Sequence, residues 1–251
     1  MSFGYKYLDY GNKKLYYKGS DLMKDKKYIP TVHSTLREKS VLVPEEIYKA
    51  SGIKILNRRI KSLVFSTDVA ILSNCNADAT MAVYPFTPSL SITNAIMTAT
   101  PLPVFAGVGG GTTSGSRVIN IALHAELMGA FGVVVNAPIP NYIIREIREV
   151  LDIPILATVV SFNDDIEAKI ESGAEILNVS GGKNTIDLVK KIREKVGDEF
   201  PIIATGGPTK ELILETIEAG ANAITFTPPS NGEIFSKVME KYRKRSDEFK
   251  K

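Results

Sequence analysis

Short apolar stretches recur along the chain from residue 60 onward, and they begin in two alternating ways. Four follow an alanine-led start, at Ala77, Ala130, Ala174 and Ala221, and three follow a proline, at Pro103, Pro154 and Pro201. A proline at the first residue of a strand removes no hydrogen bond from the ladder, so both starts are compatible with strands. With the apolar run at 63–65 added in front, the pattern predicts eight strands, near residues 62–66, 80–84, 103–107, 132–136, 154–159, 175–179, 201–205 and 223–227.

Helical patterns lie between these strands. Residues 184–196 carry apolar side chains on one face and lysines on the other, at helical spacing. Residues 209–219 repeat the pattern, with Thr209 as the N-cap and Gly220 as the C-terminal stop. Strands that alternate with helices form parallel βαβ units. We therefore predict an α/β protein, a closed (β/α)8 TIM barrel with an N-terminal extension that contains a β-hairpin.

Alternation along each strand separates a face that packs on the helices from a face that lines the barrel interior. On the predicted inner face, polar residues such as Asn136, Asn178 and Ser180 gather toward the C-terminal strand ends. The active sites of these barrels lie at those ends. We expect these residues to contact a ligand, together with Thr205 and the loop residue Lys183. A purely structural role, in which the side chains bond only to their neighbours, stays open.

Two glycine clusters follow predicted strands. The first is Gly109-Gly110-Gly111, before the helix led by Arg117, and the second is Gly206-Gly207. Glycine lets backbone amides approach an anion, and the helix start that follows adds the positive end of a dipole. The first cluster lacks both the P-loop lysine and the G-x-G-x-x-G spacing, so neither nucleotide motif applies. The alternative is that short turns between strand and helix simply require glycine.

The second cluster resembles part of a known group. Residues 202–226, with Gly206-Gly207 and the later segment EAGANAI, resemble the seventh and eighth units of the phosphate-binding (ribulose-phosphate-binding-like) β/α barrels. That group includes the thiamine phosphate synthases, the histidine-pathway barrels and the flavin-binding barrels. Residues 108–111 resemble the triple glycine of the histidine-pathway barrels, and residues 79–89 are similar to the second strand of the tryptophan synthase α subunit.

The resemblance implies a phosphate-bearing ligand. Its phosphate would lie at Gly206 and Gly207, with the first glycine cluster contributing, and with Ser230 and Asn231 from the eighth unit. Residues 227–232 read TPPSNG where many relatives have a glycine–serine pair, so the eighth unit departs from the pattern.

Ionisable residues are few at the predicted strand ends. Asp68 follows the first strand, and Asp164 and Asp165 follow the fifth. In the histidine-pathway barrels the acid–base aspartates come from these two units, so the resemblance implies the same role here. The alternative is that these residues start helices. The predicted strands contain no lysine for Schiff-base chemistry, and one cysteine with two histidines offers no metal site.

The N-terminal segment has a composition of its own. Residues 1–28 hold seven lysines against three aspartates, and two Lys- and Tyr-rich runs flank Gly11-Asn12, a hairpin signal. We predict an N-terminal extension over 1–58 and the barrel over 59–251. The hairpin either stacks on single-stranded nucleic acid or covers a barrel end or a neighbouring subunit, and we favour the second interpretation.

Overall composition narrows the class of protein. The 251 residues are 44% apolar and 24% charged, with a net charge of +3, which is ordinary for a globular domain and too balanced for a dedicated nucleic-acid binder. No apolar run approaches the length of a membrane span. We expect a cytoplasmic homo-oligomer.

Together these patterns predict an enzyme that binds a small phosphorylated metabolite and uses acid–base catalysis of the lyase, isomerase or synthase type. A flavin-binding oxidoreductase is the nearest alternative, with FMN as its cofactor, because flavin phosphate uses the same glycines. A metabolite-binding barrel without catalysis is the alternative from another class, and it fits the shortage of ionisable groups.

Overall fold

The computed structural model of the protein describes residues 5–10, 13–18, 28, 30–34, 36 and 38–248. Contacts divide the chain into two units, Met1–Glu38 and Lys39–Lys251. In the first unit, β1 (Tyr5–Tyr10) and β2 (Lys13–Lys18) pair antiparallel, which confirms the predicted hairpin, while Gly11-Asn12 lies outside the described residues. The boundary predicted at residue 58 stays a prediction.

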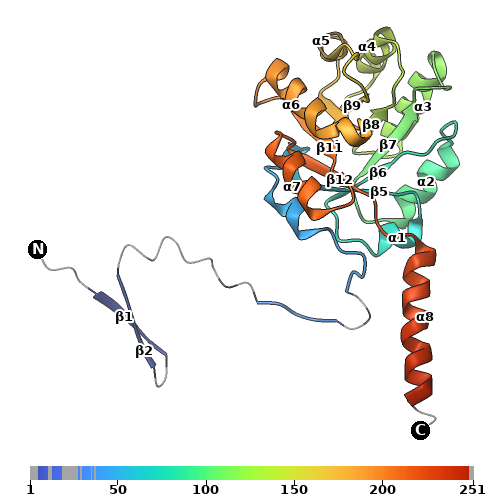
Figure 1. Ribbon diagram of the computed structural model, residues 1–251. Helices are drawn as coiled ribbons and strands as arrows, with labels where there is room; N and C mark the ends of the chain where they lie inside the picture. Colours follow the sequence, from blue (N-terminus) through green and yellow to red (C-terminus); the bar gives the residue numbers. More distant parts are fainter. Residues whose placement is uncertain are drawn as a thin grey trace, which may run out of the picture. The chain divides into compact units, whose positions relative to one another are not determined.

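Eight parallel strands close into a barrel in the second unit (Figure 1). They follow the order of the chain, and β12 pairs with β5 to complete the ring. The predicted (β/α)8 TIM barrel is therefore confirmed. The strands are β5 (Ser62–Phe65), β6 (Ala79–Ala82), β7 (Val104–Gly109), β8 (Gly132–Val135), β9 (Ile155–Val159), β10 (Ile176–Val179), β11 (Ile202–Thr205) and β12 (Ala223–Phe226).

Helices follow the strands; α1 to α7 lie around the barrel, and α8 extends away from it (Figure 1). The N-cap predicted at Thr209 is present, since its side chain accepts a hydrogen bond from the Leu212 N–H. No helix of the described residues is long and apolar enough to cross a membrane. The helices are α1 (Val69–Ser73), α2 (Leu90–Ala99), α3 (Ser116–Leu127), α4 (Asn141–Val150), α5 (Ile166–Glu171), α6 (Thr185–Val196), α7 (Lys210–Glu218) and α8 (Asn231–Glu248), with a 3₁₀ turn, η3 (Gly182–Asn184), before α6.

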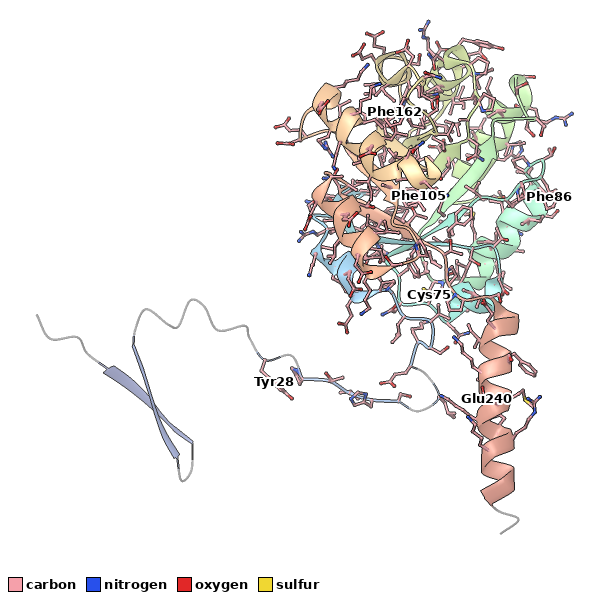
Figure 2. The ribbon with its side chains drawn as sticks, in the orientation of Figure 1. Tyr28, Cys75, Phe86, Phe105, Phe162 and Glu240 are labelled. Atoms are coloured by element: carbon pink, nitrogen blue, oxygen red, sulfur yellow. The ribbon has the colours of Figure 1, made fainter. Side chains whose placement is uncertain are left out.

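The buried apolar residues form two clusters, one on each face of the strands. The outer cluster joins strand residues such as Val135 and Val179 to the helices. The inner cluster contains Val134 and Ile176 from the same strands, together with Phe105, which lies in the middle of the barrel (Figure 2). Successive strand side chains therefore alternate between the two clusters, as a closed barrel requires.

A short hairpin closes the N-terminal end of the barrel. It consists of β3 (Ile53–Ile55) and β4 (Arg58–Ile60), which pair antiparallel. Ile53, Ile55 and Ile60 are buried in the inner cluster. The two turn residues have positive φ, 41° at Leu56 and 66° at Asn57, as the tight hairpin turns that match the strand twist require. The hairpin fills the end opposite to the mouth.

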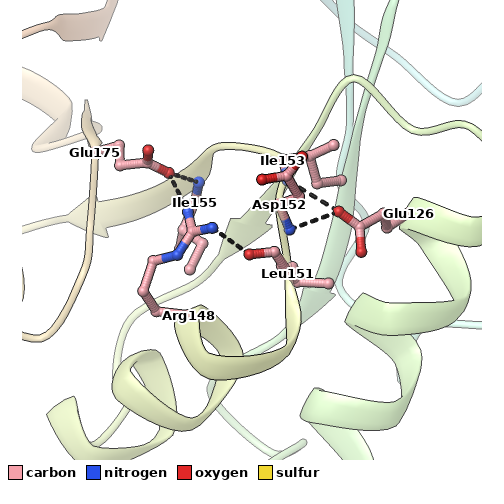
Figure 3. A network of polar contacts seen from close by, with 7 residues as sticks. All are labelled: Glu126, Arg148, Leu151, Asp152, Ile153, Ile155 and Glu175. Atoms are coloured by element: carbon pink, nitrogen blue, oxygen red, sulfur yellow. Dashed lines mark hydrogen bonds and ion pairs between the residues drawn. The ribbon is translucent and has the colours of Figure 1, made fainter.

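Charged side chains at this N-terminal end bond to the turns before the strands (Figure 3). Glu126 Oε1 accepts the N–H groups of Asp152 and Ile153, at 2.7 and 2.9 Å. Glu175 pairs with Arg148 at 2.7 Å and also accepts from the Ile155 N–H. These carboxylates accept backbone N–H groups that have no partner in the sheet. They therefore stabilise the N-terminal end of the barrel, opposite to the C-terminal mouth where barrel active sites lie.

The segment before the barrel also packs on its outside. The 3₁₀ turn η2 (Glu45–Lys49) lies against α7, and its Ile47 is fully buried. Glu46 Oε1 pairs with Lys210 Nζ at 3.0 Å, while Glu46 Oε2 is buried without a partner among the described residues. Its own backbone N–H, and then the Lys210 ammonium, lower the pKa of Glu46.

Candidate functional site

Neutral polar side chains line the inner face of the barrel near its C-terminal mouth. Asn178 Nδ2 donates to Thr158 Oγ1 at 3.2 Å, and Thr158 Oγ1 donates to Asn136 Oδ1 at 3.5 Å. These residues stand two positions beyond Val134, Leu156 and Ile176 of the inner cluster, so they share its face. They form a hydrogen-bonded row across β8, β9 and β10.

The row continues over the next strands. Thr205 Oγ1 donates to Ser180 Oγ at 3.4 Å, and Thr205 is in register with Thr225 on β12. The Thr225 hydroxyl is buried and has no hydrogen-bond partner among the described residues. An unpaired buried hydroxyl is costly, which makes this group a candidate ligand contact. We call Asn136, Thr158, Asn178, Ser180, Thr205 and Thr225 together the polar band.

A cavity of about 220 Å³ opens beside Asn136, between the loops after β6, β7 and β8. We call it the glycine-lined cavity. Gly110 and Gly111 lie in its wall, but their N–H groups already donate to Thr113 O and Pro138 O, both at 2.8 Å. These two amides are paired within the protein, so Gly110 and Gly111 shape the cavity instead of supplying donors. The wall is formed by Val83, Tyr84, Pro85, Phe86, Pro88, Gly107, Gly109, Gly110, Gly111, Thr112, Thr113 and Asn136.

A larger cavity of about 570 Å³ lies beside the loops after β10 and β11. We call it the rim cavity. The Gly206 N–H is not free, because it donates to Thr225 O at 3.1 Å. Gly207, at φ +74°, has no bond to its N–H among the described residues, and it stands just before the N-terminus of α7. The wall is formed by Gly182, Lys183, Thr185, Ile186, Thr205, Gly206, Gly207, Pro208, Leu212 and Thr216.

The first predicted catalytic residue caps a helix. Asp68 Oδ1 accepts the N–H groups of Ala70 and Ile71, at 2.9 and 3.2 Å, at the start of α1. The other oxygen, Oδ2, has no bond among the described residues. Asp68 therefore starts a helix, as the structural alternative predicts. Its Oδ2 is the carboxylate oxygen that is available for proton transfer.

The two aspartates after β9 also bond to the backbone. Asp164 Oδ2 accepts from the N–H groups of Val160 and Ser161, at 2.9 and 3.0 Å, and Asp164 Oδ1 lies 3.8 Å from the buried Lys169 ammonium. Asp165 Oδ1 accepts the Ala168 N–H at 3.0 Å and caps α5. Both oxygens of Asp164 are engaged, so Asp165 is the more available of the pair.

The eighth unit starts its helix with a capping box. The Ser230 hydroxyl and N–H both donate to Glu233 Oε2, at 2.7 Å each, and the Glu233 N–H donates back to Ser230 Oγ at 3.2 Å. The Ser230 hydroxyl, and then its backbone N–H, lower the pKa of Glu233. A phosphate at Ser230 or Asn231 would meet this carboxylate, so the eighth unit is a poor partner for an anion.

Thr158 and Thr225 were not among the predicted site residues. A signal for Thr158 exists, since applying the same alternation to the proline-led strands places Thr158 and Thr205 four residues after Pro154 and Pro201. The burial of Thr225 without a partner follows from the closed barrel and has no local signal.

The described residues contain no group of three or more His, Cys, Asp or Glu side chains placed to hold a metal ion. The lone cysteine, Cys75, is buried near the N-terminal end of β6, and its burial raises the pKa of its thiol. Neither finding adds a reactive group to the mouth.

Comparison with known protein families gives no match, and neither does comparison with the curated proteins. Among solved structures, a provisionally assigned phosphonomutase from Burkholderia cenocepacia has a TM-score of 0.56 and 16% identity, covering 73% of this chain and 93% of its own. A phosphonopyruvate hydrolase has a TM-score of 0.55 and 14% identity, covering 80% and 85%. A 2,3-dimethylmalate lyase of the PEP mutase/isocitrate lyase superfamily has a TM-score of 0.52 and 12% identity, and the match covers 81% of this chain and 85% of the lyase.

At these identities the similarity shows the fold alone. It supports the TIM barrel, and it does not single out the phosphate-binding barrels that the glycine motifs resemble.

Proposed function

We propose that the barrel binds a small phosphorylated metabolite at its C-terminal mouth and acts on it by lyase-, isomerase- or synthase-type acid–base chemistry. The observation that carries the proposal is the position of Thr205. This residue lines the rim cavity and also bonds to Ser180 of the polar band. In this proposal one ligand of modest size contacts both the rim cavity and the barrel interior, with Thr205 between them.

In this proposal the phosphate lies in the rim cavity. The Gly207 N–H has no partner among the described residues, and the first N–H groups of α7 follow it. These donors and the helix dipole favour an anion. Lys183 stands exposed in the same wall and adds a positive charge. Gly206 does not supply a donor, but a glycine is needed at this position, because a Cβ there would lie 2.5 Å from Ile224 Cγ2.

The uncharged part of the metabolite lies over the polar band. Asn136, Asn178, Ser180 and Thr205 supply hydrogen bonds without any charge. The oxygen Asp68 Oδ2 is the proposed acid–base group, and Asp165 is the second choice. Two of the similar structures, a phosphonopyruvate hydrolase and a 2,3-dimethylmalate lyase, are enzymes, which is compatible with this proposal.

A metabolite-binding barrel without catalysis is the second candidate. The observation that favours it is that Asp68, Asp164 and Asp165 all bond to backbone N–H groups. The flavin alternative stays a prediction, and a yellow purified protein would favour it. The proposal includes two further expectations from the sequence. The protein is a cytoplasmic homo-oligomer, and it belongs to the phosphate-binding barrels.

Titration with inorganic phosphate, followed by NMR of the backbone amides, tests the phosphate site. We expect the Gly207 resonance to shift, and Gly207→Asp to weaken binding because it places a like charge beside the amide. Gly207→Asn is the matched control, since it has the same shape, tolerates φ +74° as well as Asp does, and carries no charge. Equal binding by wild type and both folded variants would refute the site.

A further inference from the structure

The two walls of the glycine-lined cavity differ in kind. One wall is the segment Tyr84-Pro85-Phe86 with Pro88, and the other is bare backbone at Gly107 and Gly109–Gly111. The Tyr84 hydroxyl accepts the Ser89 N–H at 2.7 Å, which fixes the ring. Phe86 is 76% exposed and projects from the surface (Figure 2), so a ligand here would cover apolar area. A ring-and-proline wall facing a glycine wall suits a flat group.

No charged side chain lines this cavity in the part of the chain that the structure describes. A carboxylate would lose water without gaining a cationic partner, which is strongly unfavourable. The cavity, about 220 Å³, is also smaller than the ~300–1,000 Å³ of a site for a whole drug-sized ligand. It therefore suits one uncharged part of a larger molecule.

The polar band determines which atoms of Asn136 face a ligand. Thr158 has one hydroxyl proton, and its oxygen already accepts from Asn178 Nδ2. That proton is donated to Asn136 Oδ1, which lies 3.5 Å from Thr158 Oγ1. Asn136 Nδ2 then has no partner among the described residues and offers two N–H donors at the cavity wall. Thr158 and Asn178 are each 6% exposed, so water does not substitute freely for these bonds.

The main chain of Asn136 is fixed as well. Its N–H donates to Gly109 O at 2.8 Å, and a Cβ on Gly110 would lie 2.0 Å from its carbonyl oxygen. The loop after β7 therefore packs directly on Asn136. The position of the residue is therefore set by the backbone around it, and its amide is held by the bond to Thr158.

We propose that the glycine-lined cavity binds a planar, uncharged ring that bears a carbonyl group, with the carbonyl oxygen accepting from Asn136 Nδ2. Thr158 is a positioning residue, which holds the amide of Asn136 in the donor orientation. The inference rests on the proposed function, because it assigns the chemical class of the uncharged part of the metabolite. It makes no use of the phosphate site.

The test uses ¹⁵N-labelled full-length protein and the side-chain NH₂ resonances of Asn136, assigned with Asn136→Asp. Three fragments act as probes: uracil, 2-pyridone and pyridine. We expect the two carbonyl rings to shift the Asn136 NH₂ signals and pyridine to leave them unchanged. Benzoate, a planar carboxylate, should bind more weakly than uracil. The proposal is overturned if neither carbonyl ring shifts these signals, or if benzoate binds as well as uracil.

Variants of Thr158 test its positioning role. Thr158→Val keeps the shape but removes the hydroxyl, and we expect uracil to bind about two- to tenfold more weakly, the net worth of one hydrogen bond. Thr158→Ser restores the hydroxyl and should restore both the affinity and the NH₂ shift. Equal affinity in the folded Val and Ser variants would remove Thr158 from the proposal. Phosphate titration at Gly207 is independent of all these readouts, so failure of the proposed function and failure of this inference are distinguishable.

Discussion

Gly110→Ala is the substitution for which the structure predicts the largest local effect at the mouth. Gly110 has φ +103°, which an L-residue adopts only with strain, at a cost of about 1–3 kcal/mol. Its new Cβ would also lie 2.0 Å from Asn136 O and 2.6 Å from Asn136 C. Both are backbone atoms that cannot rotate away, so relieving the overlap costs a further ~1–3 kcal/mol. We expect a total destabilisation of about 2–6 kcal/mol, the sum of these two ranges.

The neighbouring glycine supplies the control. Gly111 has φ +66°, and a Cβ there would meet nothing within 4 Å, so Gly111→Ala bears only the cost of left-handed backbone, about 1–2 kcal/mol. At about 2–4 °C per kcal/mol for a domain of this size, Gly110→Ala should melt roughly 4–24 °C below wild type and Gly111→Ala roughly 2–8 °C below. Circular dichroism during heating gives both values. Equal melting temperatures for the two variants would show that the loop does not pack on Asn136 as described.

Four other predictions concern helix capping, acid–base catalysis, an ion pair and the cysteine. Asp68→Asn should keep the cap of α1 and change the free energy of unfolding in urea by less than about 0.5 kcal/mol. Asp68→Ala should lower that free energy by about 1 kcal/mol. Equal losses in the two variants would contradict the capping role. If Asp68 carries the proton, Asp68→Asn should also lower turnover of an identified substrate by about 100-fold or more, and full activity would move that role to Asp165. The pKa of Glu46 is lowered in the folded state, so its stabilisation is present above about pH 4.5 and is lost as the pH falls through the folded pKa. Glu46→Gln should therefore be less stable than wild type at pH 7 and approach it in acid, whereas a gap that does not change with pH would exclude the pair with Lys210 as its cause. Burial raises the pKa of the Cys75 thiol, so alkylation at pH 7 should be slow until the protein unfolds, and fast labelling of the native protein would show that the thiol is accessible.

Local sequence signals are sufficient for the barrel strands and for the two helices whose bounds are predicted, at 184–196 and 209–219. The alanine- and proline-led starts place seven barrel strands, and the apolar run at 63–65 places the first, all within two residues of their observed bounds. Strand period and the chemistry of the starting residue are local properties, so these signals lie in the sequence itself. The N-cap at Thr209 is local too, since side chain and N–H lie three residues apart.

Features set by distant contacts were not predictable in the same way. The β3–β4 hairpin went unassigned, because its strands are three residues each and its turn uses Leu56 and Asn57 without a glycine. The availability of amides in the glycine clusters also depends on register, since the Gly206 N–H pairs with Thr225 O on the next strand. Glycines that resemble one kind of anion site in the sequence therefore differ in the structure: the N–H groups of Gly110, Gly111 and Gly206 are paired, and that of Gly207 has no partner among the described residues.

The most direct test of the central claim compares phosphorylated metabolites with their dephosphorylated counterparts as ligands of the full-length protein. Thermal unfolding is measured with each member of a pair at the same concentration. A ligand present at 100 times its Kd stabilises the protein by about 2.7 kcal/mol, which corresponds to a rise in Tm of roughly 5–10 °C. We predict that at least one phosphorylated compound produces such a rise, that its dephosphorylated partner does not, and that Gly207→Asp abolishes the difference while Gly207→Asn keeps it. Stabilisation that is the same for both members of every pair would contradict the account.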